Sequence, residues 1–224
     1  MTHLHIADGV LPVPLWVAGL LLTAGLVAFV SYRHRADRAD RLTLLGSLAA
    51  VMLAAMAVPL GPIGHLSFAP VVGILLGPGL GFLAAVVVNA ILALLGHGGI
   101  TVLGLNALVL GAGTVAARPL FRLARARFEP GPAAATASVI GGVVSVLALW
   151  VVLALAGDAG SGVAAGHDEH GRAASAVTMF GGLSATSRFI ALSAPFWTLG
   201  LAVEAVVSAS VIGFIARVRP ELLP

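Results

Sequence analysis

Two histidines, His3 and His5, lie at the start of the chain in the stretch MTHLHIADGVLP. A terminal amine followed by X-X-His offers four nitrogen ligands in a plane: the amine, two ionised amides and the imidazole. Met1-Thr2-His3 has this arrangement. If Met1 is removed, as the small Thr2 favours, Thr2-His3 supplies amine, amide and imidazole and leaves a fourth position for another imidazole. Such tetragonal nitrogen sites favour Ni(II) or Cu(II). The alternative is a terminus that simply frays.

The residues that follow favour an ordered terminus. Asp8-Gly9 is a common turn pair, and Pro12 and Pro14 restrict the backbone shortly after it. The sequence therefore predicts a turn that folds the end of the chain back.

Two further histidines stand beside glycines. His65, in VPLGPIGHLSFAP, follows an apolar segment and is far from any charge, so we expect an ordered, non-helical segment near the membrane face. Such backbone is tolerated where it lines a cavity or packs against protein. The alternative is an interfacial histidine bonded to a carbonyl. His97, in LLGHGGITVLG, is either a turn residue or an additional metal ligand.

A third pair, His167 and His170, flanks Asp168 and Glu169 in AAGHDEHGRAAS. This tract either collects metal loosely or is a solvated loop.

Glu204 is the only charged side chain between Arg188 and Arg217. Carboxylates inside membrane helices usually face the bundle interior and have a partner. Asn89 and Asn106, on neighbouring predicted helices, are the candidate partners. Glu204 therefore belongs either to a structural hydrogen-bond network or to a proton relay.

The composition places these residues in a membrane protein. The chain of 224 residues is 59% hydrophobic and 9% charged, and its mean hydropathy is +1.08. Soluble proteins contain about 25% charged residues. Residues 43–117 carry no charged side chain, and at about 20 residues per crossing they must fold back as several helices. Cysteine is absent, which excludes disulfides and thiolate sites.

Charges, Gly and Pro divide the chain into seven apolar segments, and no strand-like alternation occurs. The sequence predicts an all-α, polytopic bundle of about seven transmembrane helices and a single transmembrane domain over 1–224. Residues 77–79, Gly-Pro-Gly, mark a broken or re-entrant element. The segments are roughly 13–32, 43–58, 67–77, 79–96, 101–121, 133–157 and 188–216.

Arginine placement sets the predicted orientation. Three clusters, in 33–41, in 118–127 and at 217–219, fall on one side of a seven-crossing chain. The positive-inside rule makes that side cytoplasmic, with the N-terminus outside and the C-terminus inside. All the histidines except His34 then lie on the external side, and 158–187 is an external loop.

Several function classes lack their sequence signatures. The chain contains neither HExxH nor GxSxG, so a metalloprotease or serine enzyme is not indicated, and we expect no enzyme. Its arginines sit at helix ends rather than on a nucleic-acid face. It has no GxxxxGK[ST] loop, so it does not bind ATP in that manner.

Four stretches resemble the CbiM/NikM family, the metal-binding membrane components of energy-coupling-factor transporters for cobalt and nickel. Residues 130–187 have no clear match. The stretches are HIADGVLP at 5–12, GHLSFAPVVGILLGP at 64–78, LLGHGGITVLGLNAL at 94–108 and GLAVEAVVSASVIGFIARVRPELL at 200–223.

The resemblance implies that the metal, Ni(II) or Co(II), is bound in a square plane by the terminal amine, the amide and side chain of the adjoining histidine, and His65. Family chains commonly begin one residue before the histidine that matches His5. In this chain Thr2-His3 restores an amine-adjacent histidine, so the metal set comprises Thr2, His3, His5 and His65, within a chelating segment at 1–12. His97 stands where the family more often has Asp.

The resemblance also implies partners and a location. The partners are a transmembrane coupling protein, cytoplasmic ATPase subunits and a small accessory membrane subunit. The location is the inner membrane of a bacterium. The sequence leaves nickel and cobalt open. The alternative function is a proton-coupled secondary metal transporter that uses Glu204.

Overall fold

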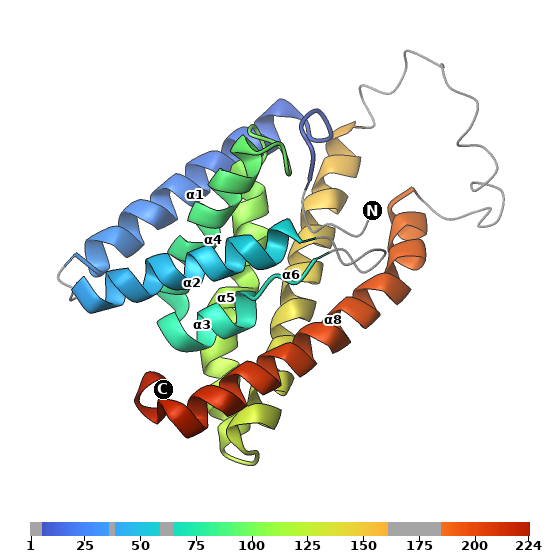
Figure 1. Ribbon diagram of the computed structural model, residues 1–224. Coiled ribbons are helices and arrows are strands. Elements are labelled where there is room, and N and C mark those ends of the chain that lie inside the picture. The colour runs from blue at the N-terminus through green and yellow to red at the C-terminus, as the bar shows by residue number, and fades with distance from the viewer. Residues whose placement is uncertain (1–5, 36–38, 59–64, 161–184) are drawn as a thin grey trace.

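The computed structural model describes residues 6–35, 39–58, 65–160 and 185–224, without the side chains of 157–160 and 185–193. This part of the chain is helical and contains no strand, which confirms the predicted all-α bundle (Figure 1). The α-helices are α1 (Val13–Arg33), α2 (Ala39–Ala57), α3 (Ala69–Leu76), α4 (Pro78–Leu94), α5 (Leu103–Arg125), α6 (Pro130–Gly160) and α8 (Ala185–Val218), followed by the 3-10 helix η3 (Pro220–Leu222).

Five of these helices, α1, α2, α5, α6 and α8, are long and apolar enough to cross a membrane. α4, with 17 residues, is a shorter apolar helix. Large apolar side chains point outward, among them Leu21 and Phe29 of α1, which are 70% and 59% exposed. Lipid tails, unlike water, solvate such side chains without cost. The chain is therefore a multi-pass membrane protein.

The Gly-Pro-Gly element separates α3 from α4, as predicted. Gly77 has φ +87°, a conformation that favours glycine, and Pro78 supplies the first residue of α4. α3 has 8 residues and is about 12 Å long at 1.5 Å per residue. The hydrocarbon core of a bilayer is about 30 Å thick. α3 is thus too short to cross alone, and a third crossing would also need the residues that precede it.

The arginine clusters meet at one end of the bundle. Arg41 of α2 and Arg118 and Arg122 of α5 line one groove of about 690 Å³ together with the C-terminal residues 221–224. Arg118 donates through Nε to the Ile74 carbonyl (2.8 Å) and through a terminal nitrogen to the Leu75 carbonyl (2.7 Å), both at the end of α3. Cations commonly stabilise helix C-termini in this way. The predicted common side is confirmed for these residues.

α5 is the central helix and packs against α1, α3, α4 and α6. Half of its spanning window is buried inside the protein. Small residues allow the close approach of α1: a Cβ built on Gly104 would lie 2.6 Å from the backbone of Gly19. The hydroxyl of Thr23 donates to the Gly104 carbonyl at 2.8 Å. Such contacts hold helices together in lipid, where burial of apolar surface does not.

Candidate metal site and its supports

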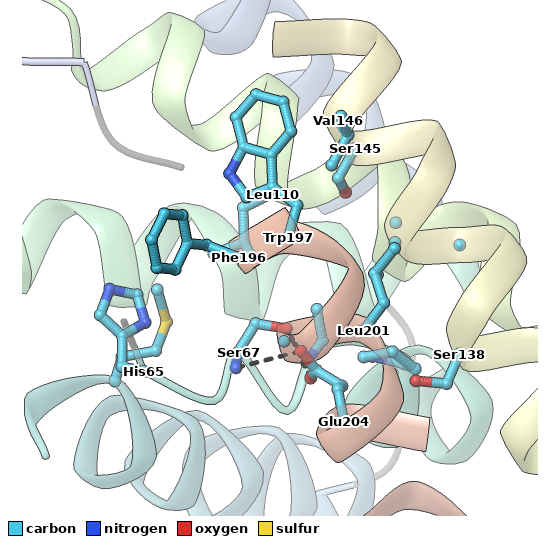
Figure 2. Close-up of a pocket in the computed structure, with 17 residues that line it drawn as sticks. His65, Ser67, Leu110, Ser138, Ser145, Val146, Phe196, Trp197, Leu201 and Glu204 are labelled. Atoms are coloured by element: carbon cyan, nitrogen blue, oxygen red, sulfur yellow. Dashed lines mark hydrogen bonds between the residues drawn. The ribbon is translucent and has the colours of Figure 1, made fainter. Parts of the chain in front are cut away.

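His65 lines a small cavity inside the bundle. The cavity has a volume of about 70 Å³, enough for a few water molecules. His65 comes from the non-helical segment 65–68 between α2 and α3, as the surrounding glycines and prolines predicted. Polar side chains from three parts of the chain face the cavity, and Figure 2 shows several of them: His65 and Ser67 from the segment, Ser138 and Ser145 from α6, and Glu204 from α8.

Ser67 is the partner of the intramembrane carboxylate. The Ser67 hydroxyl donates to Oε1 of Glu204 at 2.7 Å, and the Ser67 backbone N–H donates to Oε2 at 3.4 Å. Figure 2 shows His65 on one side of Ser67 and Glu204 on the other. The sequence pointed to asparagines instead. Asn89 donates to the Ala85 carbonyl of its own helix, and Asn106 bonds to Ile6, so the proposed asparagine partners are corrected to Ser67.

Phe68, the last residue of the segment, has a strained backbone. Its φ of +56° and ψ of 3° are left-handed, and among the described residues it is the one non-glycine residue with positive φ. A left-handed conformation costs an L-residue roughly 1–2 kcal/mol. It persists where the surroundings fix it, and here both flanking residues are held: Ala69 N–H donates to the Ser67 hydroxyl oxygen at 3.1 Å.

The N-terminal segment is fixed to α5 at Ile6. The side-chain amide of Asn106 accepts a bond from Ile6 N–H at 2.8 Å and donates one to the Ile6 carbonyl at 3.0 Å. Gly99 N–H also donates to the Ile6 carbonyl, at 3.1 Å. Ile6 and Asn106 are 5% and 2% exposed, so these polar groups have no access to bulk water. The residue that follows His5 therefore has a defined position.

Asp8 forms a second attachment, to the connection between α4 and α5. Its carboxylate accepts bonds from Ile100 N–H (3.0 Å), Thr101 N–H (2.9 Å) and the Thr101 hydroxyl. The Thr101 hydroxyl, with the backbone donors, holds the pKa of Asp8 below its ordinary value. A Cβ on Gly99 would lie 2.2 Å from Asp8 Oδ1, so only glycine fits there. The turn predicted at Asp8-Gly9 is confirmed, and Gly9 has φ +81°.

His97 lies in the same connection, exposed and flanked by Gly96 and Gly98, which have φ +80° and +88°. Its N–H donates to the Leu92 carbonyl at the end of α4. It is not among the residues that line the cavity of His65. The turn interpretation accounts for these features, and a role as a ligand stays a prediction.

The remaining predicted ligands, Thr2, His3 and His5, lie outside the described residues, as does the HDEH tract of the 158–187 loop. Within the described part, no group of three or more His, Asp or Glu residues could hold a metal ion. The structure therefore places one predicted ligand, His65, in a cavity, and fixes the chain at the residue next to a second, His5.

A mostly apolar cavity that several polar side chains face, within a bundle of membrane-length helices, is typical of membrane proteins that bind a solute. The chain belongs to the CbiM family, described as the cobalt uptake substrate-specific transmembrane region, whose model matches residues 5–222. This is a family of transporter membrane components and not of enzymes.

The fold is similar to those of two solved crystal structures. One is described as a transition metal transporter, with a TM-score of 0.73 and 17% sequence identity over 96% of this chain and 93% of that chain. The other is described as a truncated transition metal transporter, with a TM-score of 0.70 and 17% identity over 98% of this chain and 100% of that chain. At this identity the likeness concerns the fold alone. The chain matches no curated protein sequence.

Proposed function

We propose that this chain is the metal-capturing membrane subunit of an ATP-driven energy-coupling-factor importer for nickel or cobalt ions. The metal would bind between the N-terminal segment, through the amine and His3 or His5, and the imidazole of His65. Nitrogen ligands of this kind suit both Ni(II) and Co(II).

One observation carries this proposal: the fold brings the N-terminal segment and His65 to the same region. Ile6 belongs to a hydrophobic cluster that contains Val146 and Trp197. The same two side chains line the cavity of His65. The cluster that contains Ile6 thus extends to the cavity of His65, and a ligand set drawn from both segments requires such proximity.

Family membership and the sequence support the proposed partners. A cobalt uptake membrane component without a Walker A loop would draw on ATP through another subunit, and this chain has no lysine with which to build such a loop. We therefore propose a transmembrane coupling protein and cytoplasmic ATPase subunits as partners, with a small accessory membrane subunit.

The alternative, a proton-coupled secondary transporter, would rely on Glu204. Both carboxylate oxygens of Glu204 accept bonds from Ser67, which favours a structural role. Uptake into proteoliposomes separates the two functions. Our proposal requires ATP and the partner subunits, whereas metal uptake by this chain alone, driven by a proton gradient, would establish the alternative.

The test of metal capture is titration of the purified, C-terminally tagged chain with Ni(II) and Co(II). His65→Ala should weaken binding by more than the roughly 10–100-fold that loss of a supporting residue costs. His170→Ala, in the HDEH tract, is the matched control and should leave the affinity nearly unchanged. Equal affinities of the wild type and His65→Ala would remove His65 from the site.

A further inference from the structure

The segment that carries His65, residues 65–68, lies outside the helices, yet it is fixed at Ser67. The Ser67 hydroxyl has two partners: it donates to Oε1 of Glu204 and accepts from Ala69 N–H, the first residue of α3. The Ser67 backbone N–H donates to the other carboxylate oxygen. Ser67 is 8% exposed, so water does not replace these bonds readily.

We propose that Glu204 is a positioning residue: its carboxylate holds the 65–68 segment against α8 and so sets the place of the His65 imidazole for the incoming metal. The inference rests on the proposed function, because it takes His65 to be a ligand. Glu204 itself does not bind the metal, and acts through Ser67.

The geometry explains why a carboxylate is suited to this task. A carboxylate only accepts hydrogen bonds, and its two oxygens meet the two donors that Ser67 offers, the hydroxyl and the backbone N–H. The hydroxyl keeps its lone pairs for Ala69, which fixes the start of α3. The left-handed Phe68 lies between these two fixed residues. One side chain on α8 thus secures the whole turn that follows His65.

Loss of this contact frees the segment without removing the imidazole. In Glu204→Ala, Ser67 loses both acceptors, and the left-handed turn at Phe68 loses one of its two supports. His65 then spends less time in the position that the metal needs. Residues that orient metal ligands commonly change the affinity by 10–100-fold when removed, and we expect a decrease of this size.

The experiment measures nickel affinity and the absorption spectrum of the nickel-loaded, purified full chain for His65→Ala and four further variants. Glu204→Ala removes both bonds to Ser67, and Ser67→Ala removes the shorter one, from the hydroxyl. Ser67→Ala deletes a single oxygen, so it remains informative if Glu204→Ala does not fold. Glu204→Gln keeps a carbonyl acceptor and can donate to the Ser67 hydroxyl. Ser208→Ala is the matched control, because Ser208 lies one turn further along α8 and bonds to Ser138 instead.

We expect weaker binding and a shifted nickel absorption band in Glu204→Ala and Ser67→Ala, because water replaces the imidazole in part of the molecules. Glu204→Gln should restore the wild-type band and most of the affinity, and Ser208→Ala should behave as the wild type.

Wild-type affinity and spectrum in both Glu204→Ala and Ser67→Ala, with His65→Ala weakened, would overturn the positioning role alone. A folded Glu204→Gln as defective as Glu204→Ala would also overturn it. Unchanged binding in His65→Ala would instead overturn the proposed function.

Discussion

Asn106 on α5 and Ile6 near the start of the chain form a reciprocal pair: the amide oxygen accepts from Ile6 N–H and the amide nitrogen donates to the Ile6 carbonyl. One side-chain amide thus bonds both the N–H and the carbonyl of a residue, as a neighbouring strand does in a β-sheet. Since Ile6 directly follows His5, the pair fixes the backbone next to this predicted ligand. A buried asparagine thereby fixes the described residues that precede α1, which lie outside any helix.

The first prediction concerns this pair. Asn106→Ala would leave the N–H of Ile6 buried without its acceptor, and each unsatisfied buried group costs about 1–3 kcal/mol. The segment should detach, and nickel affinity should fall by roughly 10–100-fold, as for other residues that support a site. Isothermal titration with Ni(II) measures this.

Asn89→Ala is the matched control for Asn106→Ala. Asn89 is equally buried, at 3% exposed, but donates within its own helix to Ala85. It should lose some thermal stability and no nickel affinity. If the two variants bound nickel equally well, Asn106 would have no special role in the site.

The second prediction concerns the pH dependence of the Asp8 attachment. The folded-state pKa of Asp8 is lowered by the Thr101 hydroxyl and the backbone donors, so the attachment stabilises the fold above the ordinary pKa of 3.8 and is lost as pH falls through the lower folded-state value. Asp8→Asn should therefore lower the Tm at pH 5 to 8, and the difference from the wild type should shrink in stronger acid. Thermal unfolding in detergent from pH 2.5 to 8 measures it.

Asp168→Asn makes the same change of charge in the HDEH tract and serves as the control for Asp8→Asn. It should follow the wild type across the whole pH range. A Tm difference between Asp8→Asn and the wild type that grew on acidification would contradict a lowered pKa of Asp8 in the folded state.

The third prediction concerns the terminal amine. A tag fused ahead of Met1 converts the amine into an amide, which should weaken nickel binding, whereas the same tag at the C-terminus should not. Binding should also fall as pH drops from 8 to 5, because amine and imidazole must lose protons to coordinate; the unperturbed values are roughly 7.7–8.0 and 6.5. Nickel titration of N-tagged, C-tagged and Thr2-initiated protein across this range measures both effects. Identical affinities and spectra for all three would mean that the histidines act only as side chains.

The fourth prediction concerns orientation. The chain has no cysteine, so single cysteines report cleanly. His97→Cys, in the exposed connection between α4 and α5, should react with an impermeant reagent added outside cells. Ala126→Cys, exposed at the end of α5 among the arginines, should react only after the cells are opened. Labelling of both positions in intact cells would refute the predicted orientation.

The sequence predicted the helices well but not their ends. The segments expected at 43–58 and 133–157 were limited by charges and Pro-rich stretches, whereas α2 begins at Ala39 and α6 at Pro130. A helix does not stop at the membrane surface, because its backbone bonds form equally well in the polar headgroup region. Charges thus mark where a helix leaves the lipid, whereas a proline that suits the first helical position, such as Pro130, marks where the helix starts.

The partner of Glu204 shows the limit of such reasoning. The sequence predicted that Glu204 is an intramembrane carboxylate with a polar partner, and in the structure Glu204 has such a partner. Asparagines on neighbouring helices were reasonable candidates, but Ser67 lies in a non-helical segment 137 positions away in the sequence. Its place two residues after His65 was the one available signal, and periodicity gives no information about a non-periodic segment.

By itself, the sequence determined that the chain is an all-α membrane protein. It also predicted that three arginine clusters share one side, and which nitrogen-bearing residues suit a transition metal. These follow from local properties: hydropathy, charge and side-chain chemistry. Only the tertiary structure decided that Asn106 holds Ile6, that Glu204 holds Ser67, and that His65 faces a cavity. Each of these contacts depends on which faces of the helices pack against each other. When helices are apolar on all sides, the periodicity of the sequence does not show which faces these are. They are set by the small residues and buried hydrogen bonds at the crossings.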